Sequence, residues 1–191
     1  MRKVFLDTET TGLSPGMIAQ LALIVEENNE IVKVKNYFFT IDYITKSAQE
    51  TCSNRGIEFY KEASNGKRFA DYAEEILQEL TGATLVGHNI SFDENFLSTE
   101  FWRLNIMFRP ESRIDTMKYF KDKVNAVNSL GRTKYPNLSE VINYCGISNN
   151  EIVETSKRLF RNIIDTDNLS AHDAIYDTVA MYLAYKKSEG Q

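Results

Sequence analysis

Two acidic residues follow directly on a short apolar run near the start of the chain. Val4–Leu6 consists of strand-forming residues, and Asp7 and Glu9 come next at alternate positions. Side chains alternate between the two faces of a strand, so Asp7 and Glu9 are predicted to point to the same side. Two like charges about 4 Å apart repel by roughly 4 kcal/mol near a protein surface. A divalent cation between them would reverse the sign of that energy, so the pair predicts the start of a metal site.

The composition fits one ordinary globular domain. The chain has 191 residues, of which 42% are hydrophobic and 26% charged, enough for a substantial core. No apolar run approaches the roughly 18 residues of a membrane span, and the first residues lead into a strand instead of a long apolar signal segment. Cys52 and Cys145 stand apart, which argues against a disulfide framework or zinc ribbon and favours a reducing cytoplasm.

The charge of the chain bears on its partners. A net charge of −5 argues against a broad nucleic-acid-binding surface, because such surfaces are usually basic. An enzyme that holds phosphate through metal ions escapes this objection, since its carboxylates count as negative while the metals supply local positive charge. Two intervals are locally basic, one over residues 118–134 and one over residues 157–161. Either could grip phosphates, although solvated faces are the simpler interpretation.

The hydrophobic pattern predicts strands mainly in the first part of the chain. Runs at residues 18–25 and 31–40 follow the first strand across short connections, which favours an antiparallel meander. Short strands are also expected at 84–87 and 113–115. Because helices alternate with strands in the later part, the chain is predicted to be α/β with a mixed sheet.

Helices are expected where apolar residues recur three or four positions apart. They are predicted over residues 69–80, 92–105, 116–123, 136–145 and from 170 to the end of the periodic pattern. Residues 41–66 are expected to form a long loop with some helix, and residues 147–168 show no clear pattern. We expect a single domain over residues 1–187, followed by a polar tail at 188–191.

Two more acidic residues stand in or near the predicted helices, and a histidine lies close to one of them. Asp93 falls near the start of one helix, and Asp177 falls inside the last. His172 precedes Asp177 by about 140° of a straight helix, so the two converge only if His172 lies in or before the first turn. Ser170 and Asp173 form a plausible capping box, which makes Ser170 the expected N-cap. The helix dipole there favours a neutral imidazole, which can accept a proton.

Three segments that contain these residues resemble motifs of the DEDD superfamily of 3′–5′ exonucleases, in its histidine-containing branch (DEDDh). The segments are residues 4–13, 86–97 and 171–178. That branch includes the proofreading epsilon subunit of bacterial replicative polymerases. The order and spacing of the motifs agree from residue 4 to about residue 185, which chance explains poorly.

The resemblance implies an RNase H-like fold, with a mixed central sheet flanked by helices, and roles for five side chains. Asp7 would bridge two metal ions, with Glu9 and Asp177 on the first ion. Asp93 would serve the second ion, directly or through water, and His172 would be the general base. Two ions about 3.5–4 Å apart stabilise the attacking and leaving oxygens. Oxygen ligands suit Mg²⁺ or Mn²⁺ better than zinc.

The resemblance also implies contacts between the terminal nucleotide and Thr10, Leu13 and Phe92. Leu13 would wedge near the last base, and Phe92 would offer an apolar or stacking surface. Many relatives carry a His-Gly-Ile-Thr-like stretch between the first two motifs, where this chain has Asn-Arg-Gly-Ile-Glu at residues 54–58. No segment suggests a polymerase-binding or clamp-binding partner.

Other candidate residues have simpler structural interpretations. His88 is expected to shape its loop first and to touch substrate second. Asp173 is expected to be a capping acid, and Asp115 a turn or helix-start acid. Trp102 is expected to lie in the core.

The sequence therefore predicts a metal-dependent 3′–5′ exonuclease that releases nucleoside monophosphates from single-stranded or frayed ends, with DNA favoured. Two alternatives stay open: an exoribonuclease that trims RNA, and a non-catalytic nucleic-acid-binding module. The motifs do not separate DNA from RNA. The presence of all four acids and the histidine disfavours the non-catalytic module.

Overall fold

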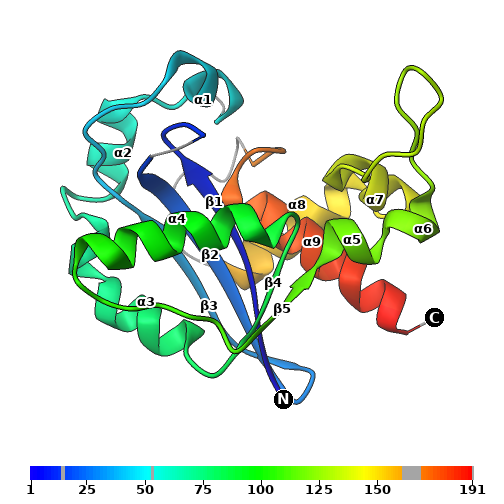
Figure 1. The fold of residues 1–191 in the computed structure, drawn as a ribbon, viewed down its shortest axis with the longest axis horizontal. Helices are drawn as coiled ribbons and strands as arrows, with labels where there is room; N and C mark the ends of the chain where they lie inside the picture. The colour runs from blue at the N-terminus through cyan, green and yellow to red at the C-terminus, as the bar shows by residue number, and fades with distance from the viewer. Residues whose placement is uncertain (14–15, 53, 161–168, 191) are drawn as a thin grey trace.

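One sheet forms the centre of the computed structural model, which describes residues 1–13, 16–52, 54–160 and 169–190. Its strands are β1 (Arg2–Thr10), β2 (Ile18–Glu27), β3 (Glu30–Phe38), β4 (Thr84–Gly87) and β5 (Ser112–Asp115), in the order β3-β2-β1-β4-β5. The first three strands pair antiparallel, and β4 and β5 run parallel to β1 (Figure 1). The predicted mixed sheet is therefore confirmed, including its short fourth and fifth strands.

The helices that the structure describes fill the connections between strands and the second half of the chain. They are α1 (Lys46–Thr51), α2 (Ile57–Ala63), η1 (Phe69–Asp71), α3 (Ala73–Leu80), α4 (Ile90–Arg103), α5 (Thr116–Tyr119), α6 (Lys121–Val124), α7 (Leu138–Tyr144), α8 (Asn149–Leu159) and α9 (Ala174–Glu189). The last helix continues through Glu189, so the first residues of the expected polar tail are helical. Arg161, part of one basic interval, lies outside the described residues.

Two helical features differ from the sequence-based expectation. The helix predicted over 116–123 is two short helices, α5 and α6, on either side of the buried Phe120. Helix α8 lies within the stretch that showed no clear pattern. Its buried positions include Thr155 and Ser156 beside Ile152, and a helix that buries polar side chains gives little apolar periodicity to detect.

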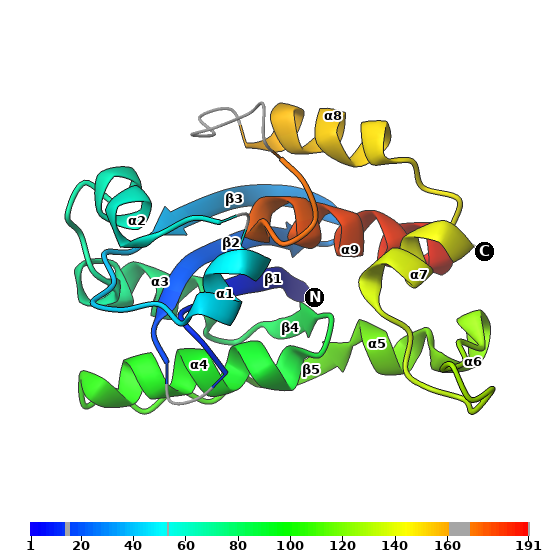
Figure 2. The ribbon, with the colours of Figure 1, turned by 90° about the horizontal axis from the view of Figure 1, so that it is seen from above.

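Helices cover both faces of the sheet. On one face Phe5 packs with residues of α7, α8 and α9, and its ring meets that of Tyr182 with centroids 4.9 Å apart. On the other face Val4 and Leu6 pack with residues of α3 and α4. Figure 2 shows α8 and α9 on one side of the strands and α4 on the other. Odd-numbered residues of β1 therefore face α9, and even-numbered residues face α4.

The prediction that Trp102 lies in the core is wrong, because this side chain is 76% exposed. Helix α4 turns Leu97 and Phe101, which are four positions apart, towards the sheet. Trp102 is one position further, about 100° around the helix, and so faces outward. Within the described part of the chain, no helix is both long and apolar enough to span a membrane.

Candidate active site

Three carboxylates meet at the carboxyl end of β1. Asp7, Glu9 and Asp177 each offer an oxygen, and these oxygens all lie within 4.8 Å of one another. Strand alternation turns Asp7 and Glu9 towards the α9 side, and Asp177 lies in the first turn of α9. The predicted same-side arrangement of Asp7 and Glu9 is confirmed, and residues far apart in sequence now share one cluster.

The segment before α9 places His172 beside this cluster. The N-cap of α9 is Asp173, whose carboxylate accepts the N–H of Ile175 at 2.9 Å. The prediction of Ser170 as N-cap is wrong, because His172 adopts a left-handed backbone (φ 67°) and interrupts any helix that would begin at Ser170. The backbone N–H of His172 donates to Asp177 Oδ2 at 3.2 Å. His172 thus lies just before the helix, as convergence with Asp177 requires, and its side chain is exposed.

Asp93 lies at the other side of the strand end. It is buried in the first turn of α4, and its Oδ1 accepts two hydrogen bonds from Thr8, from the backbone N–H at 3.0 Å and from Oγ1 at 2.7 Å. Thr8 is an even-numbered residue of β1, so it faces α4 and meets Asp93. Asp93 is therefore outside the group of three, although its charge raises the pKa of Asp7.

The pKa values of all four acids are raised above their usual values. Loss of solvent is the main cause that raises the pKa of Asp7 well above its usual value, and the charges of Asp93 and Asp177 add to it. Burial raises the pKa of Glu9 to about 8 and those of Asp93 and Asp177 to about 7. None of the ion pairs between described residues includes any of these four acids. Hard divalent cations match such an oxygen-rich, under-neutralised site.

A cavity of about 430 Å³ opens next to the cluster. It is lined by Glu9 and by the three residues expected to contact a terminal nucleotide, Thr10, Leu13 and Phe92. Residues of the α1 region, including Thr45 and Cys52, also line it. Leu13 is 87% exposed, and the Phe92 ring packs on Phe96 with centroids 4.9 Å apart. The cavity thus offers exposed and packed apolar surfaces beside a carboxylate cluster.

Two residues beside the cluster had no role in the sequence-based interpretation. The Cys52 thiol donates to Glu9 Oε2 at 2.9 Å. Arg55 donates from Nη1 to Asp173 Oδ2 at 2.6 Å, and both side chains are almost fully buried. Arg55 lies in the stretch that replaces the His-Gly-Ile-Thr-like segment of relatives, which was the one sequence signal available. Arg55 thereby ties that segment to the residue that follows His172.

The structural interpretations of His88 and Asp115 are confirmed. His88 Nδ1 lies 3.1 Å from Thr116 Oγ1, and its Nε2 lies 3.1 Å from the carbonyl oxygen of Pro136. Burial lowers the pKa of His88. Asp115 is the N-cap of α5 and also accepts the backbone N–H of Asn89 at 3.1 Å. These contacts shape the loop before α4 and therefore position its first turn.

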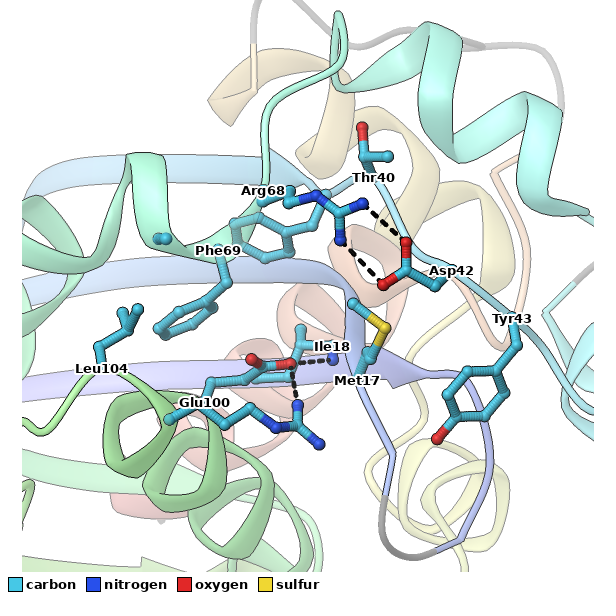
Figure 3. Close-up of a pocket in the computed structure, with 12 residues that line it drawn as sticks. Met17, Ile18, Thr40, Asp42, Tyr43, Arg68, Phe69, Glu100 and Leu104 are labelled. Carbon is cyan, nitrogen blue, oxygen red and sulfur yellow. Dashed lines mark hydrogen bonds and ion pairs between the residues drawn. The ribbon is translucent and has the colours of Figure 1, made fainter.

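A second cavity, of about 370 Å³, lies between η1, the start of β2 and the end of α4 (Figure 3). Its acids are paired. Glu100 Oε1 lies 3.0 Å from both the backbone nitrogen of Ile18 and the guanidinium of Arg103. Asp42 accepts two hydrogen bonds from Arg68, at 2.7 and 3.0 Å. This cavity therefore shows none of the uncompensated charge of the first.

The comparisons with known proteins agree on one family. The family model described as Exonuclease (RNase_T) matches residues 4–185. The chain is 29% identical over 118 residues to the 3′-5′ exonuclease DinG of Staphylococcus epidermidis, and 27% identical over 118 residues to that of Staphylococcus saprophyticus. Each match covers 61% of this chain but only 13% of the relative.

Solved structures show the same fold. E. coli Exonuclease I in complex with a dT13 oligonucleotide aligns with a TM-score of 0.74 at 19% identity, over 98% of this chain and 40% of that one. Exonuclease I from Methylocaldum szegediense aligns with a TM-score of 0.72 at 19% identity, over 100% of this chain and 40% of that one. The predicted RNase H-like fold is confirmed. Because the family model spans nearly the whole sequence, this chain belongs to the exonuclease (RNase_T) family within the DEDD superfamily of 3′–5′ exonucleases.

Proposed function

We propose that this protein is a metal-dependent 3′–5′ exonuclease that releases nucleoside monophosphates from single-stranded or frayed DNA. The observation that carries the proposal is the cluster of Asp7, Glu9 and Asp177, whose oxygens lie within 4.8 Å of one another beside a cavity of nucleotide size. The family uses divalent metals, and the all-oxygen cluster favours Mg²⁺ or Mn²⁺.

In this proposal each acid has a defined task. Asp7, Glu9 and Asp177 would hold the first ion, and Asp7 would also contribute to holding the second. Asp93 would serve the second ion from the α4 side, with its orientation fixed by the two hydrogen bonds from Thr8. When bound, the ions would supply electrostatic stabilisation of the attacking and leaving oxygens in an in-line displacement. Hydrogen bonds such as those from Thr8 to the Asp93 carboxylate hold a metal ligand in a productive orientation.

His172 is the proposed general base. Its exposed side chain stands on a backbone held to Asp177 by the 3.2 Å hydrogen bond, and this attachment beside the carboxylate cluster supports the role. Its neighbour Asp173 is fixed both as N-cap and by Arg55. The imidazole accepts the proton of the water as the water oxygen bonds to phosphorus, while the bond between phosphorus and the 3′ oxygen of the preceding nucleotide breaks and that oxygen leaves, taking up a proton from solvent.

Thr10, Leu13 and Phe92 are the proposed contacts of the terminal nucleotide. All three line the cavity beside Glu9. The exposed Leu13 wedges against the last base, and Phe92 offers it an apolar face. Relatives support a DNA substrate: Exonuclease I structures contain dT13 and dA16 oligonucleotides, and one is a zinc-bound complex with single-stranded DNA.

Residues 1–187 form one exonuclease domain, in line with a family match over residues 4–185. Both cysteines are free, which supports a reducing cytoplasm.

The test is digestion of 5′-labelled oligonucleotides, with matched DNA and RNA sequences, in the presence of Mg²⁺ or Mn²⁺. We expect stepwise shortening from the 3′ end that chelator abolishes, and faster shortening of DNA than of RNA. Faster cleavage of RNA would make the chain an exoribonuclease. Oligonucleotide binding without shortening, under any of these metals, would overturn the proposal in favour of a non-catalytic module.

A further inference from the structure

The segment between β5 and α7 is strongly basic in an acidic protein. Residues 116–135, here called the basic segment, contain five basic side chains and one acidic one, a net charge of +4 in a chain whose total is −5. The basic residues are Lys118, Lys121, Lys123, Arg132 and Lys134. The rest of the chain therefore has a net charge of −9, so the segment differs in sign from the remainder.

Both ends of the basic segment are attached to the loop that leads into the active site. His88 contacts Thr116 at the beginning of the segment and the carbonyl of Pro136 just past its end, each at 3.1 Å. The adjacent Asn89 donates its backbone N–H to Asp115. This loop continues directly into the first turn of α4, which carries Phe92 and Asp93. The base of the segment is therefore fixed beside the proposed catalytic centre.

The middle of the basic segment projects from the body of the molecule. Val127 and Thr133 form an isolated antiparallel bridge, and Asn128 closes the turn between them through hydrogen bonds with Arg132 and Leu130. In Figure 1 the loop between α6 and α7 and helix α1 both reach the upper side of the molecule, the loop at the right and α1 at the left, and Figure 2 also shows them apart. The α1 region lines the nucleotide cavity, so a strand that leaves the cavity would have to run along this side of the molecule to reach the loop.

The exposed surface of the segment combines cations with aromatic and apolar side chains. Lys123 lies over the ring of Tyr119 at 4.1 Å, and Lys121 lies over that of Tyr135 at 5.0 Å. At the tip, Val127 and Leu130 are 56% and 74% exposed. Surfaces that bind single strands show this combination, because cations track the phosphates while apolar and aromatic groups contact the bases.

Not every cation of the segment is available. Lys134 pairs with Glu140, and Lys118 lies 3.6 Å from a carboxylate oxygen of Asp115. Lys121, Lys123 and Arg132 take part in none of the ion pairs formed between described residues. Lys123 also donates a hydrogen bond to the Tyr119 hydroxyl at 3.0 Å. Within the described part of the chain, the charges of these three cations are therefore not paired with a carboxylate and can meet phosphate.

We propose that the basic segment binds the substrate strand on the 5′ side of the scissile nucleotide, with Lys121, Lys123 and Arg132 on its phosphates. This inference rests on the proposed function and adds to it a preference for strands long enough to reach the segment. Each phosphate contact releases condensed counterions, which gives binding a steep dependence on salt.

The test compares the wild-type protein with K121Q/K123Q/R132Q. A matched control, K157Q/R158Q/K187Q, removes the same charge from exposed positions on α8 and the end of α9. The substrates are the p-nitrophenyl ester of thymidine 5′-monophosphate, which fills only the terminal cavity, and the oligonucleotides dT3 and dT12. Initial rates with Mn²⁺ give kcat and KM for each.

We expect the wild-type KM to be at least about tenfold lower for dT12 than for dT3. The basic-segment variant should raise the KM for dT12 by about tenfold or more and leave hydrolysis of the ester unchanged. The slope of log(kcat/KM) against log[salt] should become shallower by about 2, since single strands contribute roughly 0.7 per contact. Equal effects of the two triple variants on dT12 would overturn the proposal.

A binding measurement separates this proposal from the proposed function. Fluorescence anisotropy of labelled dT12 is measured in chelator, where no cleavage occurs. Weaker binding by the basic-segment variant than by the control supports the strand site, even if the wild-type protein hydrolyses nothing. Equal dT12 affinities of both variants reject the strand site, whereas failure of the wild type to cleave the ester and both oligonucleotides rejects only the proposed function.

Discussion

The two cavities contain the same kinds of acidic side chain in opposite electrostatic settings. In the second cavity Glu100 meets Arg103, and Asp42 meets Arg68. In the first, Glu9 accepts a hydrogen bond from a thiol and lies near other carboxylates, and burial raises its pKa to about 8 although the charge of Arg55 lowers it, whereas the pKa of Asp42 is lowered by Arg68. Carboxylates with arginine partners are already neutralised. A buried cluster whose described acids form no ion pair is costly unless a cation that is not part of the chain completes it.

The largest expected effect is the loss of activity on exchanging Asp7 for asparagine. Asp7→Asn removes the proposed bridging charge, and each bound ion stabilises the transition state by several kcal/mol. We expect the cleavage rate to fall by about 10⁴-fold or more. The matched variant Asp42→Asn makes the same chemical change in the second cavity and should cleave at the wild-type rate. Comparable loss in both variants would show that the two cavities do not differ as argued.

The substitution His172→Ala is expected to have the next largest effect on activity. Loss of a general base slows proton transfer by roughly 10²–10⁴-fold. The variant should fold normally, because the His172 side chain is exposed and only its backbone N–H binds Asp177. The measurement is kcat of the variant and of the wild-type protein at one fixed pH, with and without added imidazole, which should partly restore the lost rate. An unchanged rate in the variant would remove His172 from the chemistry.

The uncompensated charge also predicts how stability depends on pH. The folded pKa values of Glu9, about 8, and of Asp93 and Asp177, about 7, exceed the ordinary values of 4.5 and 3.8. The folded state therefore retains protons that the unfolded state has released, so these groups make stability decrease as pH rises from about 4 to about 8. The Tm of the metal-free protein should fall over this range.

Bound metal should reverse the loss of stability at high pH. At pH 8, free Mn²⁺ at about 100 times its Kd should add roughly 2.7 kcal/mol, or about 5–10 °C in Tm for a domain of this size. Asp7→Asn should show a higher metal-free Tm than wild type at pH 8 and a smaller gain from metal. A Tm that is independent of both pH and metal would contradict the electrostatic account of the cluster.

Glu100→Gln is expected to change stability by a smaller amount and with the opposite sign to Asp7→Asn. Glu100 is buried and paired with Arg103, so loss of its charge should lower the free energy of unfolding by roughly 1–2 kcal/mol. The rate per folded molecule should stay at the wild-type value. Denaturant unfolding at pH 8 without metal gives the comparison with Asp7→Asn. The same sign of change in both variants would remove the distinction between the cavities.

The smallest effect concerns the thiol beside the cluster. Cys52→Val removes the hydrogen bond to Glu9 at similar volume, and loss of an outer partner of a metal ligand costs about tenfold or more in metal affinity. Cys52→Ser keeps a donor and should lie close to wild type. Cys145→Val, at another buried thiol, controls for stability. Titration of activity with Mn²⁺ measures the change in metal affinity. Identical midpoints for Cys52→Val and the wild-type protein would exclude a positioning role for the thiol.

Much of the fold and of the candidate site was predictable because it rests on local pattern. The strands at residues 18–25 and 84–87 correspond closely to β2 and β4. The sequence did not predict the exposure of the Trp102 side chain, the residue at which α9 begins, or the presence of helix α8. In each of these cases packing or a competing cap decided the outcome, as when Asp173 rather than Ser170 capped α9.

The sequence by itself determined that Asp7 and Glu9 share a face, because strand alternation is a property of neighbouring residues. The resemblance of its motifs to a known family also identified Asp93, His172 and Asp177 as candidates. Only the tertiary structure decided that Asp177 joins the first two acids while Asp93 binds Thr8. It alone placed Arg55 against Asp173. Contacts between residues far apart in sequence depend on how the strands and helices pack, and no local period encodes that geometry.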